Sequence, residues 1–90
     1  MAQLYRADGT VEDYPEPANG AHYSLEEMKQ AIGGGYIQIV GTNDNRLMVI
    51  DEEGKLKEFP INEQATRLYQ HGATDPIVGD ALVCDPDQLR

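Results

Sequence analysis

The strongest constraint on the fold lies in residues 36–59, where short apolar segments alternate with clusters of turn-forming residues. The apolar segments are 36–40, 47–50 and 55–59, and the turn clusters between them are 41–45 and 51–54. Each segment is too short for a typical helix, and glycine, asparagine and aspartate favour tight turns. Strands joined by tight turns pair antiparallel, so we predict a three-stranded antiparallel meander. The near-continuous apolar character of 36–40 predicts a central place in the sheet for that strand.

A second antiparallel element, a β-hairpin, is expected over residues 1–14. Asp8 and Gly9 form a dipeptide that supplies the positive φ of a tight turn, and a returning strand follows it. Pro15 and Pro17 then end the strand, because proline has no N–H to donate to a sheet. The pattern of residues 8–15 is similar to that of residues 53–60, with an acid, a glycine, charged residues, an aromatic residue and a proline in the same order. Either two hairpins need the same turn chemistry, or a hairpin–helix unit was duplicated.

Two short helices are predicted from their capping residues. Ser24 precedes Leu25 and has Glu27 three positions later, which is the pattern of a capping box. Leu25, Met28 and Ile32 form one apolar stripe on this first helix, and Gly33 is expected to end it. Asn62 is expected to cap a second helix over residues 63–70. The apolar side of this helix faces the sheet through Ala65, Leu68 and Tyr69.

A last strand is expected from Ile77 to Cys84, interrupted at Gly79, with the residues after Pro86 fraying. The predicted fold is therefore α+β. A small antiparallel sheet combines the hairpin, the central meander and the C-terminal strand, and two short helices pack on one of its faces. Ninety residues make one domain, 1–90, with the hairpin at 1–14 and a core at 24–84.

Charge limits the classes of partner. Sixteen acidic and seven basic residues give a net charge of -9, spread evenly along the chain. Such a surface repels phosphate backbones, which argues against direct binding to DNA or RNA. The charge either keeps a small domain soluble or attracts a partner with a basic surface. One cysteine, no leader-like N-terminus and no long apolar run predict a cytoplasmic protein that does not bind membranes.

Three groups of residues are candidates for a chemical role. Gly33-Gly34-Gly35 follows a helix rather than preceding one, so a helix-to-strand reversal is favoured over a phosphate site. His22, His71 and Cys84 lack the paired spacing of metal ligands, and we expect no metal or cofactor. Cys84 with His71 or His22 is a conceivable catalytic pair, although a cysteine at the end of an apolar strand is more often a buried small hydrophobic residue.

Four polar residues are the candidate contacts of a small-ligand site: Tyr36, Asn62, Thr66 and Asp80. Asp80 is the most unusual of them, because it lies between Gly79 and Ala81 inside an apolar segment. A buried carboxylate requires hydrogen-bond donors around it. It either anchors a turn or bulge, or lines a small pocket near Asn62.

Four segments together resemble a known family: 25–28 (LEEM), 33–37 (GGGYI), 62–66 (NEQAT) and 77–82 (IVGDAL). The chain is similar over about residues 24–84 to domain of unknown function 3846, which occurs in phages, mobile elements and bacterial and archaeal genomes. The resemblance implies a phage or mobile-element setting and brings no catalytic residues with it. The N-terminal hairpin is expected to lie outside the matching region.

These observations lead to three hypotheses about function. The first is an accessory protein that binds a protein partner, such as a host defence or DNA-handling factor, through its negative surface. The alternative is a small-ligand or nucleotide-binding module, and the third is an enzyme that uses Cys84 and His71. We expect a monomer or a weak homodimer, because strand 55–59 could pair with a second copy while its two lysines oppose this.

Overall fold

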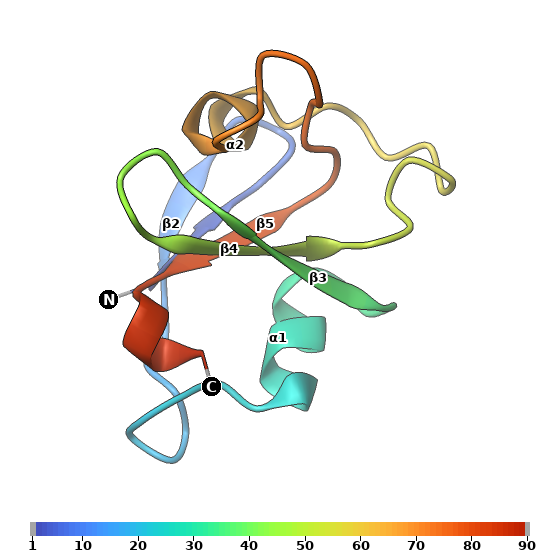
Figure 1. Cartoon of the computed structure of the whole chain (residues 1–90). Coiled ribbons are helices and arrows are strands. Elements are labelled where there is room, and N and C mark those ends of the chain that lie inside the picture. Colours follow the sequence, from blue (N-terminus) through green and yellow to red (C-terminus); the bar gives the residue numbers. More distant parts are fainter. Residues whose placement is uncertain (1, 90) are drawn as a thin grey trace.

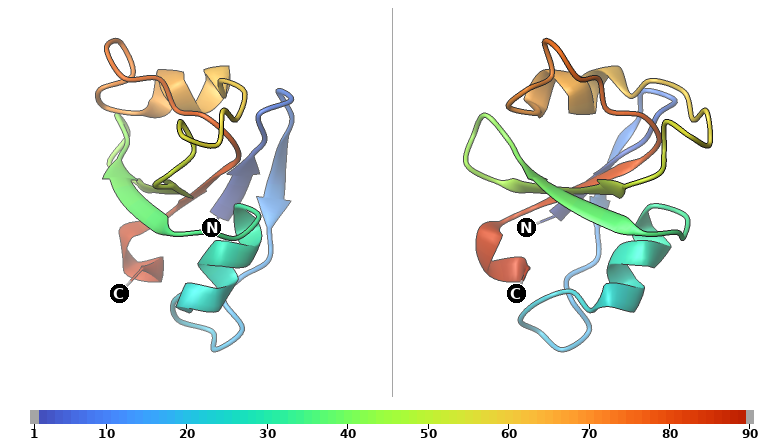
Figure 2. Two further views of the ribbon diagram at one scale, coloured as in Figure 1. Left: turned by 90° about the vertical axis from the view of Figure 1, so that its right-hand side faces the viewer. Right: turned by 45° about the vertical axis from the view of Figure 1, so that its right-hand side comes forward.

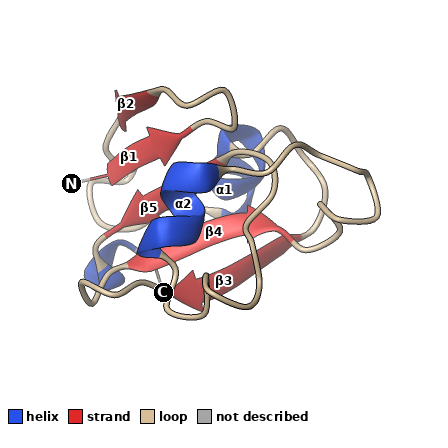
Figure 3. Cartoon of the chain, turned by 90° about the horizontal axis from the view of Figure 1, so that it is seen from above, coloured by secondary structure: helices blue, strands red, loops and turns tan. Residues whose placement is uncertain are grey.

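The computed structural model describes residues 2–89, and in that part of the chain it contains one five-stranded sheet in the order β2-β1-β5-β4-β3 (Figures 1 and 3). The elements in chain order are β1 (Ala2–Tyr5), β2 (Val11–Tyr14), α1 (Leu25–Ala31), β3 (Ile37–Gly41), β4 (Leu47–Asp51), α2 (Glu63–Leu68), β5 (Ala81–Cys84) and the 3₁₀ helix η1 (Pro86–Gln88). All neighbouring strands pair antiparallel. The α+β class and the N-terminal hairpin are confirmed, although residue 1 lies outside the described part.

The central strand is β5, not β3. β5 lies between β1 and β4, with Leu82 opposite both Leu4 and Val49. All four of its residues are fully buried. The central place predicted for 36–40 is wrong, because β3 is an edge strand on which Gln38 and Ile39 are exposed. β5 is buried on both faces and β3 is not, so β5 is the strand that occupies the middle of the sheet.

The two helices cover opposite faces of the sheet (Figures 1 and 2). On the α1 face, a cluster of buried side chains includes Met28 of the helix, Ile32 directly after it and Leu82 of the sheet. On the α2 face, a second cluster includes Ala65 and Val83. The prediction of both helices on one face is wrong. Side chains alternate along β5, so its apolar run gives each face an apolar surface, and both faces need a cover.

The third strand of the predicted meander is absent, because residues 52–58 form successive turns. Leu56, which would have faced the core, is 82% exposed, and Glu58 has a φ of 58°. Local backbone hydrogen bonds hold the segment, including that from the Phe59 N–H to the Gly54 carbonyl at 3.1 Å. β4 already pairs with β3 on one side and β5 on the other, which leaves no free edge for a strand at 55–59.

Both helix starts are confirmed in detail. Ser24 and Glu27 form the reciprocal capping box, and the Asn62 side chain accepts from the Ala65 N–H. Gly33 follows α1 with a φ of +90°, and the Gly34 N–H donates to the Lys29 carbonyl at 2.7 Å, which closes the helix end. The apolar stripe is less regular than predicted, since Leu25 is 51% exposed. α2 ends at Leu68, two residues before its predicted end.

The C-terminal residues also differ from expectation. β5 begins only at Ala81, because Gly79 has a φ of +77° and Val78 forms an isolated bridge with Ile61. After β5 and η1, Leu89 belongs to the cluster on the α1 face and is 8% exposed. The Tyr23 N–H donates to the Gln88 carbonyl at 2.8 Å. The expectation that this end frays is therefore wrong up to residue 89.

Candidate functional site

The outer side of β3 is an open sheet edge. β3 pairs with β4 on one side, and no other strand of the described residues pairs with its other side. The Glu52 N–H donates to the Tyr36 carbonyl at 2.8 Å, and the Thr42 N–H donates to the Arg46 carbonyl at 3.1 Å. Because hydrogen-bonded pairs alternate in an antiparallel ladder, the peptide groups of Ile37 and Ile39 point outward. We call residues 37–39 the β3 edge.

The β3 edge is closed at one end and uncharged along its length. At Gly41 the carbonyl accepts from the Gln70 N–H at 3.2 Å, and the next residue bridges to Tyr69. Strand β3 has no charged side chain. Ile39 is 45% exposed, and Tyr36, directly before the strand, is 65% exposed. Native proteins usually protect an edge with charge, proline or a covering segment, so this edge is unusual.

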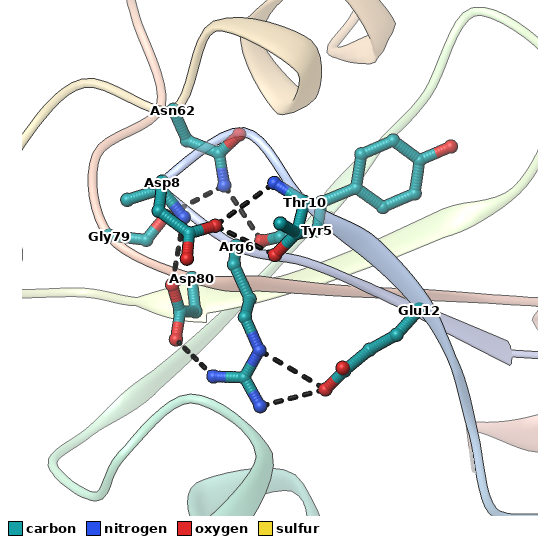
Figure 4. Close-up of polar contacts among 9 residues, drawn as sticks. Tyr5, Arg6, Asp8, Thr10, Glu12, Asn62, Gly79 and Asp80 are labelled. Atoms are coloured by element: carbon teal, nitrogen blue, oxygen red, sulfur yellow. Dashed lines mark hydrogen bonds and ion pairs between the residues drawn. The ribbon is translucent and has the colours of Figure 1, made fainter.

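The opposite edge of the sheet is protected. β2 carries Glu12 and Asp13 at its centre, both exposed. Glu12 accepts two hydrogen bonds from the Arg6 guanidinium, the shorter at 2.7 Å, and this bond is the main reason why the pKa of Arg6 is raised (Figure 4). Charges of this kind prevent edge-to-edge pairing. The two edges of one sheet therefore differ in chemistry.

A narrow cleft of about 80 Å³ adjoins the β3 edge. It is lined by Gln38, Val40, Ile50, Asp51, Glu52, Lys55, Tyr69, Asp75, Pro76, Ile77 and Val78. Lys55 forms an ion pair with Asp75, and the buried Asp51 carboxylate accepts from the Lys57 ammonium at 2.7 Å. Glu52 is exposed and forms no ion pair with any residue in the described part. The cleft wall therefore has an uncompensated carboxylate beside β3.

The turn that joins β3 to β4 is fixed by its own charges. Arg46 forms an ion pair with Asp44 at 2.7 Å. Hydrogen bonds from Arg46 and then from Thr42 lower the pKa of Asp44 to about 2. Thr42 is fully buried, and its hydroxyl oxygen accepts a hydrogen bond from the Arg46 N–H at 2.8 Å. These contacts hold β3 in position although only one strand pairs with it.

Asn62 is the centre of a polar junction between α2, β1 and the segment before β5 (Figure 4). Its side-chain amide donates to the carbonyls of Tyr5 at 2.8 Å and Gly79 at 2.9 Å, and its oxygen accepts from the Ala65 N–H at 3.1 Å. Asn62 is fully buried. Close by, the Asp80 carboxylate accepts from the Ala7 N–H at 2.9 Å. We call this set of contacts the Asn62 junction.

Thr66 belongs to the same junction. Its hydroxyl donates to the Asn62 carbonyl at 2.8 Å and accepts from the Ile77 N–H at 2.8 Å. The structure thus brings together three of the four predicted ligand contacts, Asn62, Thr66 and Asp80, and places Tyr36 at the β3 edge instead. Asp80 anchors the hairpin turn and lines a shallow hollow with Ala7 and Phe59, to which Asn62 does not contribute. Their role in ligand binding stays a prediction.

Cys84 and His71 lie on opposite sides of the sheet. Cys84 is fully buried in the α1-face cluster, and burial raises the pKa of its thiol to about 11. His71 is exposed and packs edge-on against Tyr69, which borders the α2-face cluster. Among residues 2–89 there is no group of three side chains that could hold a metal ion. No helix in that range has the length and apolar character needed to cross a bilayer.

A family model described as "Domain of unknown function (DUF3846)" matches residues 6–89. The chain belongs to the DUF3846 family. No curated protein and no solved structure matches it significantly. The family match is longer than the resemblance over 24–84, and it includes the hairpin turn and β2, so only β1 of the N-terminal hairpin precedes it. In this DUF3846 domain the β3 edge was not predictable from the sequence, because strand order determines which strand is left open. The sequence signal was the absence of charge from residues 30–43, which include β3.

Proposed function

We propose that this DUF3846 domain is an accessory protein that acts by binding a protein partner with a basic surface. The observation that carries the proposal is an open, uncharged sheet edge on an acidic molecule with a net charge of -9. An open edge offers main-chain hydrogen bonds to another chain. Long-range charge attracts a basic partner and disfavours an acidic one.

The ion pairs support the proposal, because they engage most of the positive charge. Five of the six basic residues in the described part are paired with acids: Arg6 with Glu12 and Asp80, Arg46 with Asp44, Lys55 with Asp75, Lys57 with Asp51, and Arg67 with Glu63. The remaining acids therefore set the surface potential. A field of this kind opposes direct binding to nucleic acid and favours a positively charged protein.

The small-ligand alternative has less support. The side chains of Asn62 and Thr66 already use their hydrogen-bonding groups inside the protein. The hollow that Asp80 lines has a volume of about 180 Å³, which is smaller than the roughly 300–1,000 Å³ of typical small-molecule sites. The proposal includes a host defence or DNA-handling factor as the partner and a phage or mobile-element setting. It also includes a cytoplasmic location and a monomeric or weakly dimeric state.

Affinity capture at two salt concentrations tests the proposed function. The immobilised domain is incubated with a native host extract at low salt, and bound proteins are eluted at about 1 M salt, where the Debye length falls to about 3 Å. We expect the eluted proteins to be basic. A variant that neutralises exposed acids outside the junction, Asp13→Asn, Glu26→Gln and Glu58→Gln combined, should retain less of them. Captured proteins without a basic bias, bound equally by the variant, contradict the proposal.

A further inference from the structure

We infer that the β3 edge accepts an extended segment of the partner as an added strand, and that the segment alternates basic and apolar side chains. This inference rests on the proposed function and specifies its site and ligand chemistry. It combines three observations: the outward peptide groups of residues 37–39, the different surfaces beside the two faces of β3, and the charge of the adjoining cleft. Figure 3 shows β3 at the free border of the sheet.

The backbone provides the first contact. The N–H and C=O groups of Ile37 and Ile39 point away from β4, as the register of β3 and β4 requires. An added strand lies about 4.8 Å from its neighbour and forms hydrogen bonds with these groups. Because Gln70 occupies the Gly41 carbonyl, the added strand stops before that residue. The bound segment is therefore short and pairs only beside 37–39 and the residues preceding them.

The register of β3 decides where the added side chains go. Gln38 and Val40 lie opposite Ile50 and Met48, on the α2 face, and both line the cleft. Ile39 lies opposite Val49, on the α1 face. Successive residues of an added strand therefore point alternately toward the cleft side and toward Ile39.

The two sides favour different chemistry. On the cleft side, Glu52 supplies an exposed carboxylate that forms no ion pair in the described part, whereas Asp75 is paired with Lys55. A lysine or arginine of the added strand therefore pairs with Glu52. On the other side, the half-exposed Ile39 gains from contact with an apolar residue, as cross-strand pairs do. The segment therefore alternates basic and apolar residues.

A second copy of this chain does not fit the same edge. Two copies bring together two net charges of -9, and a β3–β3 pair places the carboxylate walls of both clefts side by side. A pair between β3 of one copy and β2 of another brings Glu12 and Asp13 next to the carboxylate wall beside β3. Like charges placed side by side oppose association. The occupant is therefore a basic segment of a different protein.

Synthetic peptides test the inference directly. The first peptide alternates lysine and valine over six residues, and the second has the same composition with all lysines first. Binding to the full chain is followed by isothermal titration and by NMR shifts of residues 36–40. We expect the alternating peptide to bind at least about fivefold more tightly, because only it matches the two faces of β3.

Two matched pairs of variants locate the site. Ile39→Lys and Val11→Lys each add one positive charge at an exposed apolar position of an edge strand, the first on β3 and the second on β2. Ile39→Lys should weaken the alternating peptide by about tenfold, and Val11→Lys by about twofold or less. Glu52→Gln should weaken it by about threefold, whereas the neighbouring Glu53→Gln, which does not line the cleft, should have little effect. Circular dichroism shows whether each variant is folded.

The outcomes distinguish a failure of the strand-addition inference from a failure of the proposed function. Stronger binding of the alternating peptide, lost in Ile39→Lys and kept in Val11→Lys, supports strand addition. Equal, salt-sensitive binding of both peptides overturns the inference but leaves a charge-driven partner in place. If neither peptide binds, or if sedimentation shows that the β3 edge pairs with a second copy, the inference is wrong. The capture experiment then decides the fate of the proposed function separately.

Discussion

At the scale of single residues, Asn62 is fully buried and forms three hydrogen bonds through its side chain. Its amide nitrogen faces two carbonyl oxygens and its amide oxygen faces an N–H, so only this side chain in this orientation satisfies every contact. Asparagine is a good helix cap, and that role was predictable from the sequence. The two donor contacts join segments 57 and 17 residues away. Local sequence patterns contain no information about them.

Asn62→Asp tests this role of the amide. The carboxylate keeps the cap to Ala65 but turns an acceptor toward the carbonyls of Tyr5 and Gly79. We expect a loss of about 3 kcal/mol in the free energy of unfolding at pH 7, measured by urea denaturation. Gln64→Glu is the control, because it makes the same chemical change at an exposed amide of the same helix. A loss no larger than that of the control would show that the junction contributes little.

The buried thiol of Cys84 should make the free energy of unfolding depend on pH in the alkaline range. Burial raises the pKa of its thiol to about 11 from the ordinary value of 9.0. The unfolded chain therefore loses this proton first, so stability is complete below about pH 9 and declines as the pH rises toward 11. The slope reaches about 1.4 kcal/mol per pH unit for one proton. Cys84→Ala should flatten the decline in urea denaturation between pH 8 and 10.5, whereas an unchanged slope assigns it to other groups, such as Tyr23.

At the scale of elements, helix starts were predictable and strand partners were not. The caps at Ser24 and Asn62 depend on residues within one turn, and the sequence contains them. Residues 8–15 and 53–60 share a residue pattern, yet the first contributes β2 and the second forms turns. The two segments differ in whether a partner strand is available. β2 pairs with β1, whereas both sides of β4 are already paired and leave no partner for residues 53–60. The same reasoning explains why the β3 edge was missed and why Tyr36 alone of the four predicted contacts lies beside it.

The connection from α1 to β3 offers a test within one loop. Gly34 and Gly35 have φ values of +99° and +88°, so alanine at either position is strained by about 1–2 kcal/mol. A methyl group on Gly35 would also approach the Lys57 ammonium to 2.6 Å and the Asp51 carboxylate to 2.9 Å, while at Gly34 it meets nothing within 4 Å. We therefore expect Gly35→Ala to lower the free energy of unfolding by about 1 kcal/mol more than Gly34→Ala in urea denaturation.

A double variant separates the two causes of the Gly35 effect. In a Lys57→Ala background the ion pair with Asp51 is already broken, so the difference between the two glycine substitutions should shrink. A difference that persists unchanged would indicate that the extra cost arises from the backbone and not from the ion pair.

At the scale of the whole molecule, β5 contributes side chains to both apolar clusters. Leu82 and Cys84 belong to the cluster on the α1 face, and Ala81 and Val83 belong to that on the α2 face. If β5 leaves the sheet, both clusters lose their centre. We therefore expect both faces to unfold in one transition.

Tryptophan probes on the two faces test this cooperativity. Tyr14 borders the α1-face cluster and Tyr69 borders the α2-face cluster, and both are partly buried. The variants Tyr14→Trp and Tyr69→Trp should each give a fluorescence midpoint in urea that coincides with the midpoint from circular dichroism of the same variant. If fluorescence of Tyr69→Trp changes at lower urea than its circular dichroism, the α2 face unfolds independently.

The position of β5 also has a consequence for biosynthesis. Within the sheet, the β1–β2 hairpin and the β3–β4 hairpin are joined by β5, a strand that is translated after both of them. While the ribosome is still adding residues 81–84, the two hairpins cannot join, and each exposes an inner edge to the crowded surroundings of the nascent chain. Synthesis proceeds at about 5–20 residues per second, so this state persists for seconds before the sheet closes.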